Sequence, residues 1–146
     1  MFEKILYPTD FSDVSKKALE YIKELKQSGL KEVIILHVID SRILEASHGY
    51  LSGKSFDEFK SARYEDTIET LYKIEEELKN EGLEVKTRIE QGIPLQEILR
   101  VEAEENISAI VIGSHGMSNI KEMFLGSVSE KVIRKCKRPV LVVKRS

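Results

Sequence analysis

Short apolar runs alternate with amphipathic helical patterns from one end of this chain to the other. The runs at 4–7, 33–39, 109–112 and 140–143 have the length of β-strands, and the segments between them repeat apolar side chains at helical spacing. This alternation is typical of βα units, in which helices cover both faces of a parallel sheet. The sequence therefore predicts an α/β fold, built as a single domain over residues 1–146.

One further strand and one loop complete this outline. Val85, Thr87 and Ile89 alternate with charged residues, so we expect a strand with one solvated face, near an edge of the sheet. The helical periodicity fades between Asp40 and Ser55, where glycine and serine gather. We expect a loop there that is long enough to move or to cover a ligand.

The overall charge argues against two classes of partner. The 146 residues include 23 basic and 25 acidic side chains, which gives a net charge of −2. A protein that binds nucleic-acid phosphates or a membrane surface through charge needs a large clustered positive excess. We therefore expect neither nucleic acid nor a membrane as a partner.

The cysteine content and the start of the chain bear on its compartment. Cys136 is the only cysteine, so the chain has no intramolecular disulfide and no metal site built from cysteines. The first residues already read as a strand, and neither a signal-peptide core nor an apolar span of about 20 residues is present. These features predict a cytoplasmic protein.

A glycine-rich segment after the fourth strand has the composition of a phosphate-binding loop. Gly113-Ser114-His115-Gly116 directly follows the apolar run that ends at Ile112, and Gly126-Ser127-Val128-Ser129 opens the last helical pattern. Glycine lets the backbone approach a ligand closely, while free N–H groups and the helix dipole attract an anion. A strand, a glycine-rich loop and a helix N-terminus in this order predict an anion site.

The sequence resembles the nucleotide-binding branch of the universal stress protein family in three features. These are the glycines just described, the segment Tyr7-Pro8-Thr9-Asp10 and the closing run Pro139–Val143. The resemblance covers residues 4–144. It implies an open five-stranded parallel sheet in the order 3-2-1-4-5, with a Rossmann-like fold close to that of the adenine nucleotide alpha hydrolases. It also implies ATP as the ligand, with Mg or Mn held through the phosphates, and a homodimer joined through Val140–Val143.

The strand order places two distant segments at one site. Connections in such a sheet reverse direction after the first strand, and ligands of open α/β sheets bind in the crevice at that point. Pro8-Thr9-Asp10 ends the first strand and Gly113-Ser114-His115-Gly116 ends the fourth. We therefore expect the two segments to meet at the carboxyl edge of the sheet.

The resemblance gives several of these residues roles, and each role has a structural alternative. Asp10 would accept hydrogen bonds from nucleotide hydroxyl or amino groups, or would cap the first helix, although Ser12 already suits that cap. The backbone of Val38 would meet the adenine, and its side chain would be a core residue in either case. His37, on an apolar strand, is interpreted as a hydrogen-bonded core histidine.

The phosphate loop leaves similar alternatives open. Phosphate oxygens would contact the backbone and hydroxyl groups of Gly116, Gly126, Ser127 and Ser129. Alternatively, either serine would cap the last helix. His115 would bind a phosphate rather than transfer a proton.

These features predict an ATP-binding regulatory or switch module that acts on a protein partner which the sequence does not name. Two alternatives are a slow ATPase and a protein-interaction scaffold of the same fold. Fast hydrolysis needs a positioned water, an orienting group and charge stabilisation at the γ-phosphate. Only His115, Lys121 and Lys54 are candidates for such roles, so we expect turnover to be slow or absent.

Overall fold

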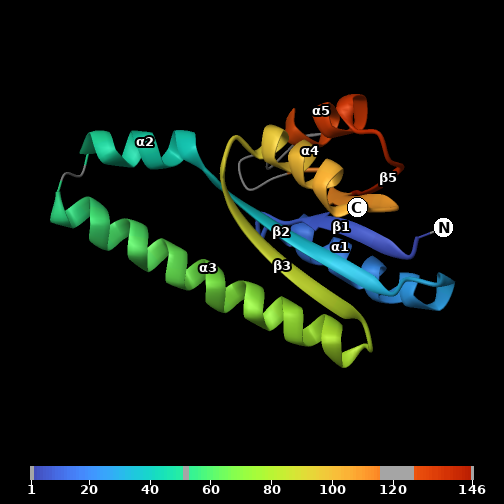
Figure 1. The fold of residues 1–146 in the computed structure, drawn as a ribbon. Helices are drawn as coiled ribbons and strands as arrows, with labels where there is room; N and C mark the ends of the chain where they lie inside the picture. The colour runs from blue at the N-terminus through green and yellow to red at the C-terminus, as the bar shows by residue number, and fades with distance from the viewer. Residues whose placement is uncertain (1, 51–52, 116–126, 146) are drawn as a thin grey trace.

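The computed structural model describes residues 2–50, 53–115 and 127–145. Its five strands are parallel and form one sheet in the order β3-β2-β1-β4-β5, which confirms the predicted topology (Figure 1). The strands are β1 (Lys4–Pro8), β2 (Glu32–Asp40), β3 (Glu84–Gly92), β4 (Ala109–Gly113) and β5 (Val140–Val143). The helices are α1 (Asp13–Leu25), with a 3-10 turn at Lys26–Ser28, then α2 (Ser41–Tyr50), α3 (Lys54–Asn80), α4 (Pro94–Glu105) and α5 (Ser127–Lys135).

Two hydrophobic cores lie on opposite faces of the sheet. Alternate side chains of a strand point to opposite faces, so the apolar run of β2 supplies both cores. Val33 and Ile35 pack with α1 and α3, whereas Ile34 and Leu36 pack with α4 and α5. All four side chains are fully buried. Helices on both faces leave the carboxyl ends of the strands as the edge at which a ligand site forms.

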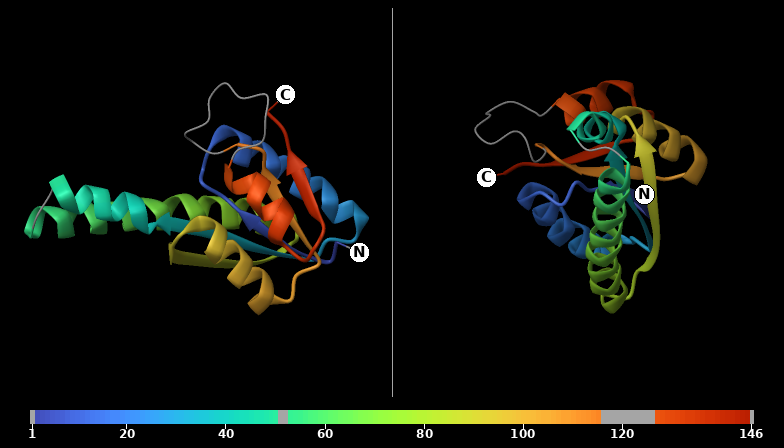
Figure 2. Two further views of the ribbon diagram at one scale, coloured as in Figure 1. Left: turned by 90° about the horizontal axis from the view of Figure 1, so that it is seen from above. Right: turned by 90° about the vertical axis from the view of Figure 1, so that its left-hand side faces the viewer.

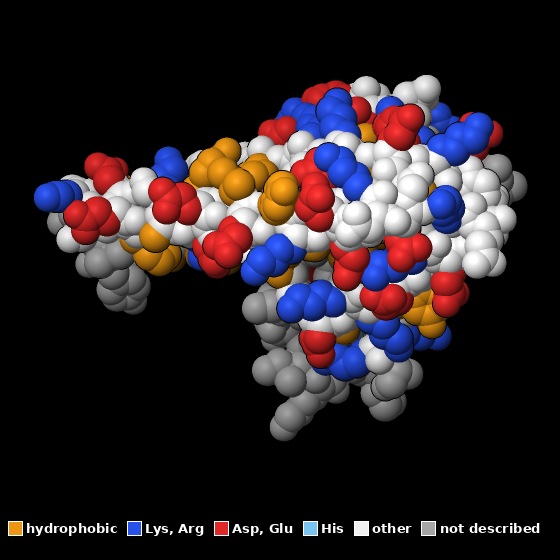
Figure 3. All heavy atoms as spheres, turned by 90° about the horizontal axis from the view of Figure 1, so that it is seen from below, with side chains coloured by type: hydrophobic (Ala, Val, Ile, Leu, Met, Phe, Trp, Pro, Cys, Tyr) orange, Lys and Arg blue, Asp and Glu red, His pale blue; other side chains and the backbone are white. Residues whose placement is uncertain are grey.

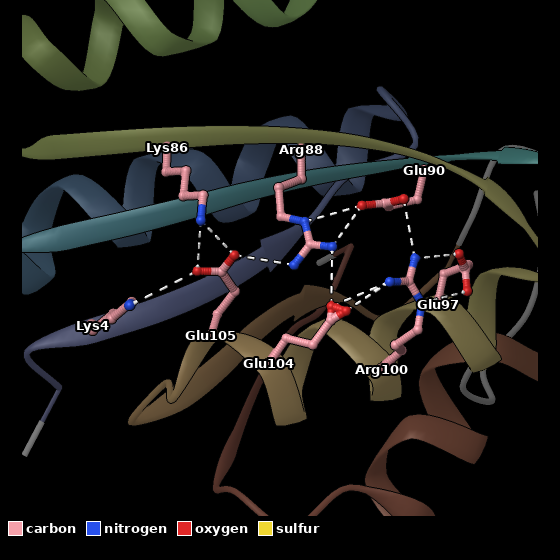
Figure 4. A network of polar contacts seen from close by, with 8 residues as sticks. All are labelled: Lys4, Lys86, Arg88, Glu90, Glu97, Arg100, Glu104 and Glu105. Atoms are coloured by element: carbon pink, nitrogen blue, oxygen red, sulfur yellow. Dashed lines mark hydrogen bonds and ion pairs between the residues drawn. The ribbon is translucent and has the colours of Figure 1, made fainter.

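The predicted edge position of the third strand is confirmed, and the charged face of β3 lies against α4. Glu105 of α4 accepts hydrogen bonds from Lys86 Nζ at 2.7 Å and from Arg88 Nη1 at 3.0 Å, both on β3. Its other oxygen lies 4.0 Å from Lys4 Nζ of β1. These contacts bind three elements together through one carboxylate, and Figure 4 shows how they continue to Glu90, Glu97, Arg100 and Glu104.

The prediction of a loop between Asp40 and Ser55 is wrong for most of that segment. Residues Ser41–Tyr50 form α2, and α3 already begins at Lys54. The backbone N–H of Arg42 donates to Asp40 Oδ1 at 3.0 Å, so Asp40 caps the first turn of α2. This cap starts a helix where the sequence shows little apolar periodicity.

Helices α2 and α3 form an arm that extends from the carboxyl edge of the sheet. Figures 1 and 2 show α2 continuing away from the end of β2 and α3 returning beside it. Only the second half of α3 reaches the core, through Leu71, Ile74 and Leu78.

None of the helices in the described ranges is both long and apolar enough to cross a bilayer.

Candidate functional site

The carboxyl end of β1 turns sharply into α1. Thr9 N donates to Leu36 O at 2.8 Å, which continues the ladder to β2 just beyond Pro8. Thr9 Oγ1 then accepts hydrogen bonds from Phe11 N at 3.1 Å and from Ser15 Oγ at 2.6 Å. Phe11 has a φ of +66°, a conformation that non-glycine residues rarely adopt. The side chain of Thr9 therefore fixes the turn that presents Asp10 at the sheet edge.

Ser12, and not Asp10, is the N-cap of α1, which settles one of the alternatives that the sequence left open. Asp10 Oδ1 accepts a hydrogen bond from Ser12 N at 3.0 Å, within the turn. The N-cap of α1 is Ser12, whose Oγ accepts from Ser15 N at 3.2 Å. Asp10 is exposed, whereas Ser12 is buried. The helix cap is thus made without Asp10.

His37 belongs to the structural support of this turn, as predicted. Its Nδ1 lies 2.8 Å from Thr9 O, and its ring stacks on Phe11 with centroids 4.4 Å apart. Burial lowers the pKa of His37, and the positive charge of Arg63 lowers it further. The hydrogen bond to Thr9 O acts in the opposite direction and raises it. The imidazole is therefore held in its neutral form. Val38 follows it on the opposite face of β2 and is half-buried.

The end of β4 is packed closely against the start of α1. A Cβ on Gly113 would lie 3.0 Å from Val14 Cγ1 and 3.3 Å from Ser15 N, so a larger residue would push the two elements apart. Gly113 follows Ile112, and both are buried. Glycine at this position therefore lets the end of β4 approach the start of α1.

Ser114 and His115 continue from Gly113 into the site. Ser114 N donates to Val143 O at 2.8 Å, and its hydroxyl lies 2.8 Å from His115 Nδ1. His115 is only 8% exposed, and its Nε2 has no hydrogen-bond partner among the residues that the structure describes. A buried polar atom without a partner is uncommon and calls for a ligand or water. His115 Nε2 is such an atom, next to the end of β4.

The N-terminus of α5 is attached to the same strand end. Ser129 Oγ donates to the carbonyl of Gly113 at 2.6 Å, so this buried hydroxyl joins two elements instead of capping its own helix. Ser127 is exposed and Val128 is half-buried in the same first turn. The first N–H groups of a helix have no partner within the helix. The positive end of the α5 dipole therefore lies beside Gly113.

Three of the predicted segments, 8–10, 112–115 and 127–129, thus lie near one another at the carboxyl edge of the sheet, because Gly113 packs against Ser15, which bonds to Thr9, and accepts a hydrogen bond from Ser129. Gly116 and Gly126 lie outside the described residues. Sequence reasoning missed the cap at Asp40, which an acidic residue directly after a strand could have signalled. It also missed Arg63, whose charge acts on both His37 and Asp40.

A pocket of about 340 Å³ opens at the carboxyl ends of β2 and β3, beside the arm. Ile39 and Ile89 line it from β2 and β3, and Leu44, Arg63 and Tyr64 line it from the arm. Asp40 ends β2 next to Ile39. Its pKa is lowered chiefly by hydrogen bonds from Arg42, and the charge of Arg63 adds a smaller effect. The carboxyl edge therefore carries apolar surface between the arm and the sheet as well as the polar crevice.

Comparison with known proteins identifies the class to which this fold and site belong. The model of the universal stress protein family matches residues 1–144, and the chain belongs to that family. Universal stress protein MJ0577 of Methanocaldococcus jannaschii is 42% identical over 156 residues, which cover 99% of this chain and 96% of that protein. Universal stress protein YxiE of Bacillus subtilis is 35% identical over 148 residues, with coverage of 99% and 100%.

Solved structures agree with this assignment. The structure of MJ0577 matches with a TM-score of 0.89 and 42% identity, covering 100% of this chain and 98% of that chain. A universal stress protein of Arabidopsis thaliana, solved with AMP bound, matches with a TM-score of 0.70 over 98% of this chain and 92% of its own. At 19% identity, this second likeness shows a shared fold.

Proposed function

We propose that this chain binds ATP in the crevice between β1 and β4 and acts as a nucleotide-dependent regulatory module in the cytoplasm. The observation that carries the proposal is His115 Nε2, which is buried without a partner among the described residues, two residues after the Gly113 carbonyl to which the first turn of α5 is bonded. A helix N-terminus and a buried nitrogen at one point suit an anion. That another protein of this fold was solved with AMP bound supports the choice of an adenine nucleotide.

The phosphates would lie between the end of β4 and the first turn of α5. The backbone N–H groups of Ser127 and Val128 are available to phosphate oxygens because they precede the first intrahelical bonds. Ser129 would contribute its backbone N–H, since its hydroxyl proton is already donated to Gly113. Gly116 and Gly126, placed in the loop by sequence alone, would complete the cradle. Mg or Mn would bind to the phosphate oxygens and neutralise their charge.

The nucleoside would lie toward β1 and β2. Asp10 is exposed at the turn after β1 and would accept hydrogen bonds from hydroxyl groups of the ribose. The backbone of Val38, near the carboxyl end of β2, would meet the adenine. The stacked pair of Phe11 and His37 holds the turn between these two contacts in place. The regulatory role rests on this arrangement, because a bound nucleotide would bridge segments of β1, β2, β4 and α5.

Titration of the protein with ATP and Mg, followed by calorimetry, tests the proposal. We expect saturable binding that is weakened about tenfold by Asp10→Asn, since a hydrogen bond to a charged group contributes about 1.5–3 kcal/mol. The asparagine oxygen can still accept the hydrogen bond from Ser12 N, so the turn should survive. Asp13→Asn, an identical change three residues away in the exposed first turn of α1, should leave the affinity within about twofold. Equal affinity in the two variants, or no binding by the wild type, would contradict the proposal.

A further inference from the structure

The first half of α3 lacks the packing that stabilises most helices of globular proteins. The buried residues of α3 begin at Thr67, and none of residues 54–66 is buried. Short helices owe their stability mainly to an apolar face packed in the tertiary structure. The part of α3 that leaves the sheet therefore has little tertiary support within this chain (Figure 1).

Three large apolar side chains form a row along the exposed side of α3, which we call the α3 stripe. Tyr64, Ile68 and Tyr72 are 46%, 46% and 59% exposed. Residues four apart lie on one side of a helix, so the three side chains are neighbours on successive turns. Figure 3 shows hydrophobic side chains gathered on the arm. Single exposed apolar residues are ordinary, whereas a contiguous row marks an interaction surface.

The α3 stripe lies on the side of α3 that is turned away from α1. Lys23 Nζ of α1 lies 3.4 Å from Glu77, which places that side of α3 toward α1. Ile68 precedes Glu77 by nine residues, or two and a half helical turns, and so lies on the opposite side of the helix. Ile68 is thus turned away from α1, whereas Tyr64, at one end of the stripe, also lines the pocket between the arm and the ends of β2 and β3. The stripe is distinct from the proposed nucleotide site.

An acidic row accompanies the stripe on its solvent side. Glu58, Glu65, Glu69 and Glu76 are separated by seven, four and seven residues, which keeps them in line along the helix. Two of them approach lysines of the same helix, Glu58 at 4.0 Å and Glu69 at 3.6 Å. Exposed pairs of this kind contribute little and are readily exchanged for others. The row therefore presents a negative flank to whatever covers the stripe.

This charge pattern discriminates between possible occupants. In an antiparallel two-fold pair of α3 helices, the acidic row of one copy would lie along the acidic row of the other, and like charges repel. A partner with basic side chains beside an apolar face would instead complement the row. The apolar spacing of the stripe matches the anchors of one helix laid along another.

We propose that the α3 stripe is the docking surface for an amphipathic helix of a partner protein, one that carries lysine or arginine beside its apolar face. The apolar anchors of that helix cover Tyr64, Ile68 and Tyr72. Its basic flank lies over Glu65 and the other members of the acidic row. Docking supplies the arm with the packing that the chain itself does not provide.

A synthetic helix of about 18 residues tests this proposal. It carries leucines at i, i+3, i+4 and i+7 with lysines beside them, and a fluorescent label; a second peptide has glutamate in place of each lysine. Anisotropy titrations of the full chain at about 0.1 M salt should show saturable binding of the basic peptide and much weaker binding of the acidic one. Ile68→Asp should weaken binding of the basic peptide at least about tenfold.

Two matched controls separate docking from general effects on the arm. Ile43→Asp changes a residue of α2 with the same 46% exposure as Ile68 and should leave the affinity within about twofold. Glu65→Lys should weaken binding, whereas Asp66→Lys, an equal change of charge one residue away and off the row, should not. Circular dichroism checks that each variant keeps its helices.

Several outcomes would overturn the proposal. These are no binding of the basic peptide, equal binding of the two peptides, or equal affinity of wild type and Ile68→Asp. Sedimentation provides a further test, because self-association of the wild type that Ile68→Asp abolishes would make a second copy the occupant. The nucleotide titration described above is unaffected by any of these results, so this proposal and the proposed function stand or fall separately.

Discussion

The hydroxyl of Ser129 donates a 2.6 Å hydrogen bond to the backbone carbonyl of Gly113, and so fastens the first turn of α5 to the end of β4. Both residues are buried. The contact joins two segments that are sixteen residues apart in the chain, on either side of the proposed phosphate site. This hydrogen bond therefore helps to hold the N-terminus of α5 beside β4.

Ser129→Ala should lower both stability and nucleotide affinity. The carbonyl of Gly113 would lose a buried partner, which costs about 1–3 kcal/mol, and the start of α5 would be less firmly held beside β4. Ser129→Thr keeps the hydroxyl and should retain most of the affinity. Urea denaturation and titration with ATP and Mg measure the two effects. An alanine variant equal to the wild type in both would show that the bond does not position the helix.

His37 should make folding stability depend on pH in a defined window. Burial lowers its pKa in the folded protein, so below about pH 6.5 the unfolded chain binds a proton that the folded protein does not. Stability should therefore fall as the pH drops from 6.5 toward the lowered pKa, and this contribution should be constant above 6.5. Denaturation at a series of pH values should show the slope in the wild type and its loss in His37→Gln. The same slope in both proteins would exclude His37 as its source.

Glu105 should contribute more to stability than an exposed ion pair does. Its side chain is 9% exposed, and the hydrogen bond from Lys86 is the main reason that its pKa lies below the usual range. Stability from this carboxylate is present above its unfolded pKa of about 4.3 and is lost as the pH falls through the lower folded value. Glu105→Gln at pH 7 should cost about 1–3 kcal/mol, since charged partners remain beneath α4.

Glu130 provides the control for this measurement. It pairs with Arg134 at 2.8 Å on the surface of α5, where the two side chains are 49% and 73% exposed. Glu130→Gln should change stability by no more than about 0.5 kcal/mol. Thermal or urea unfolding of both variants gives the comparison, and equal small losses would mean that the β3–α4 contacts of Figure 4 add little.

The free edge of β5 should join two copies of the chain, as the family resemblance implies. Val143 O accepts from the N–H of Ser114, directly after β4, and alternate residues of a parallel strand turn their backbone groups to opposite neighbours. The N–H of Val142 therefore points away from β4, at an open edge that invites pairing. Val142→Pro removes this donor without removing a bond to β4, whereas Val142→Ala keeps it.

Sedimentation equilibrium tests the β5 seam. We expect the wild type and Val142→Ala to form a two-fold dimer, closed against further growth, and Val142→Pro to shift toward monomer. A wild type that stays monomeric at high micromolar concentration would contradict this assignment of the seam.

The sequence by itself determined the sheet and predicted where the site would lie. The apolar run from Val33 to Ile39 can be stable only where both of its faces are covered, which makes it a central strand. The glycine at 113 and the serine at 129 stand where a strand end and a helix start must approach one another. These are local requirements of burial and backbone geometry, and each can be read within a few residues.

Tertiary structure alone decided the contacts between distant elements. Nothing near Lys86 or Arg88 in the sequence shows that their charges meet Glu105 of α4, because that pairing depends on how the helix crosses the sheet. The helix after Asp40 was missed because its apolar pattern is weak, and its cap became evident only with the backbone in place. The nitrogen of His115 that has no partner among the described residues, and the exposure of the α3 stripe, likewise follow from packing, since burial and orientation are set by what the rest of the chain places around each residue.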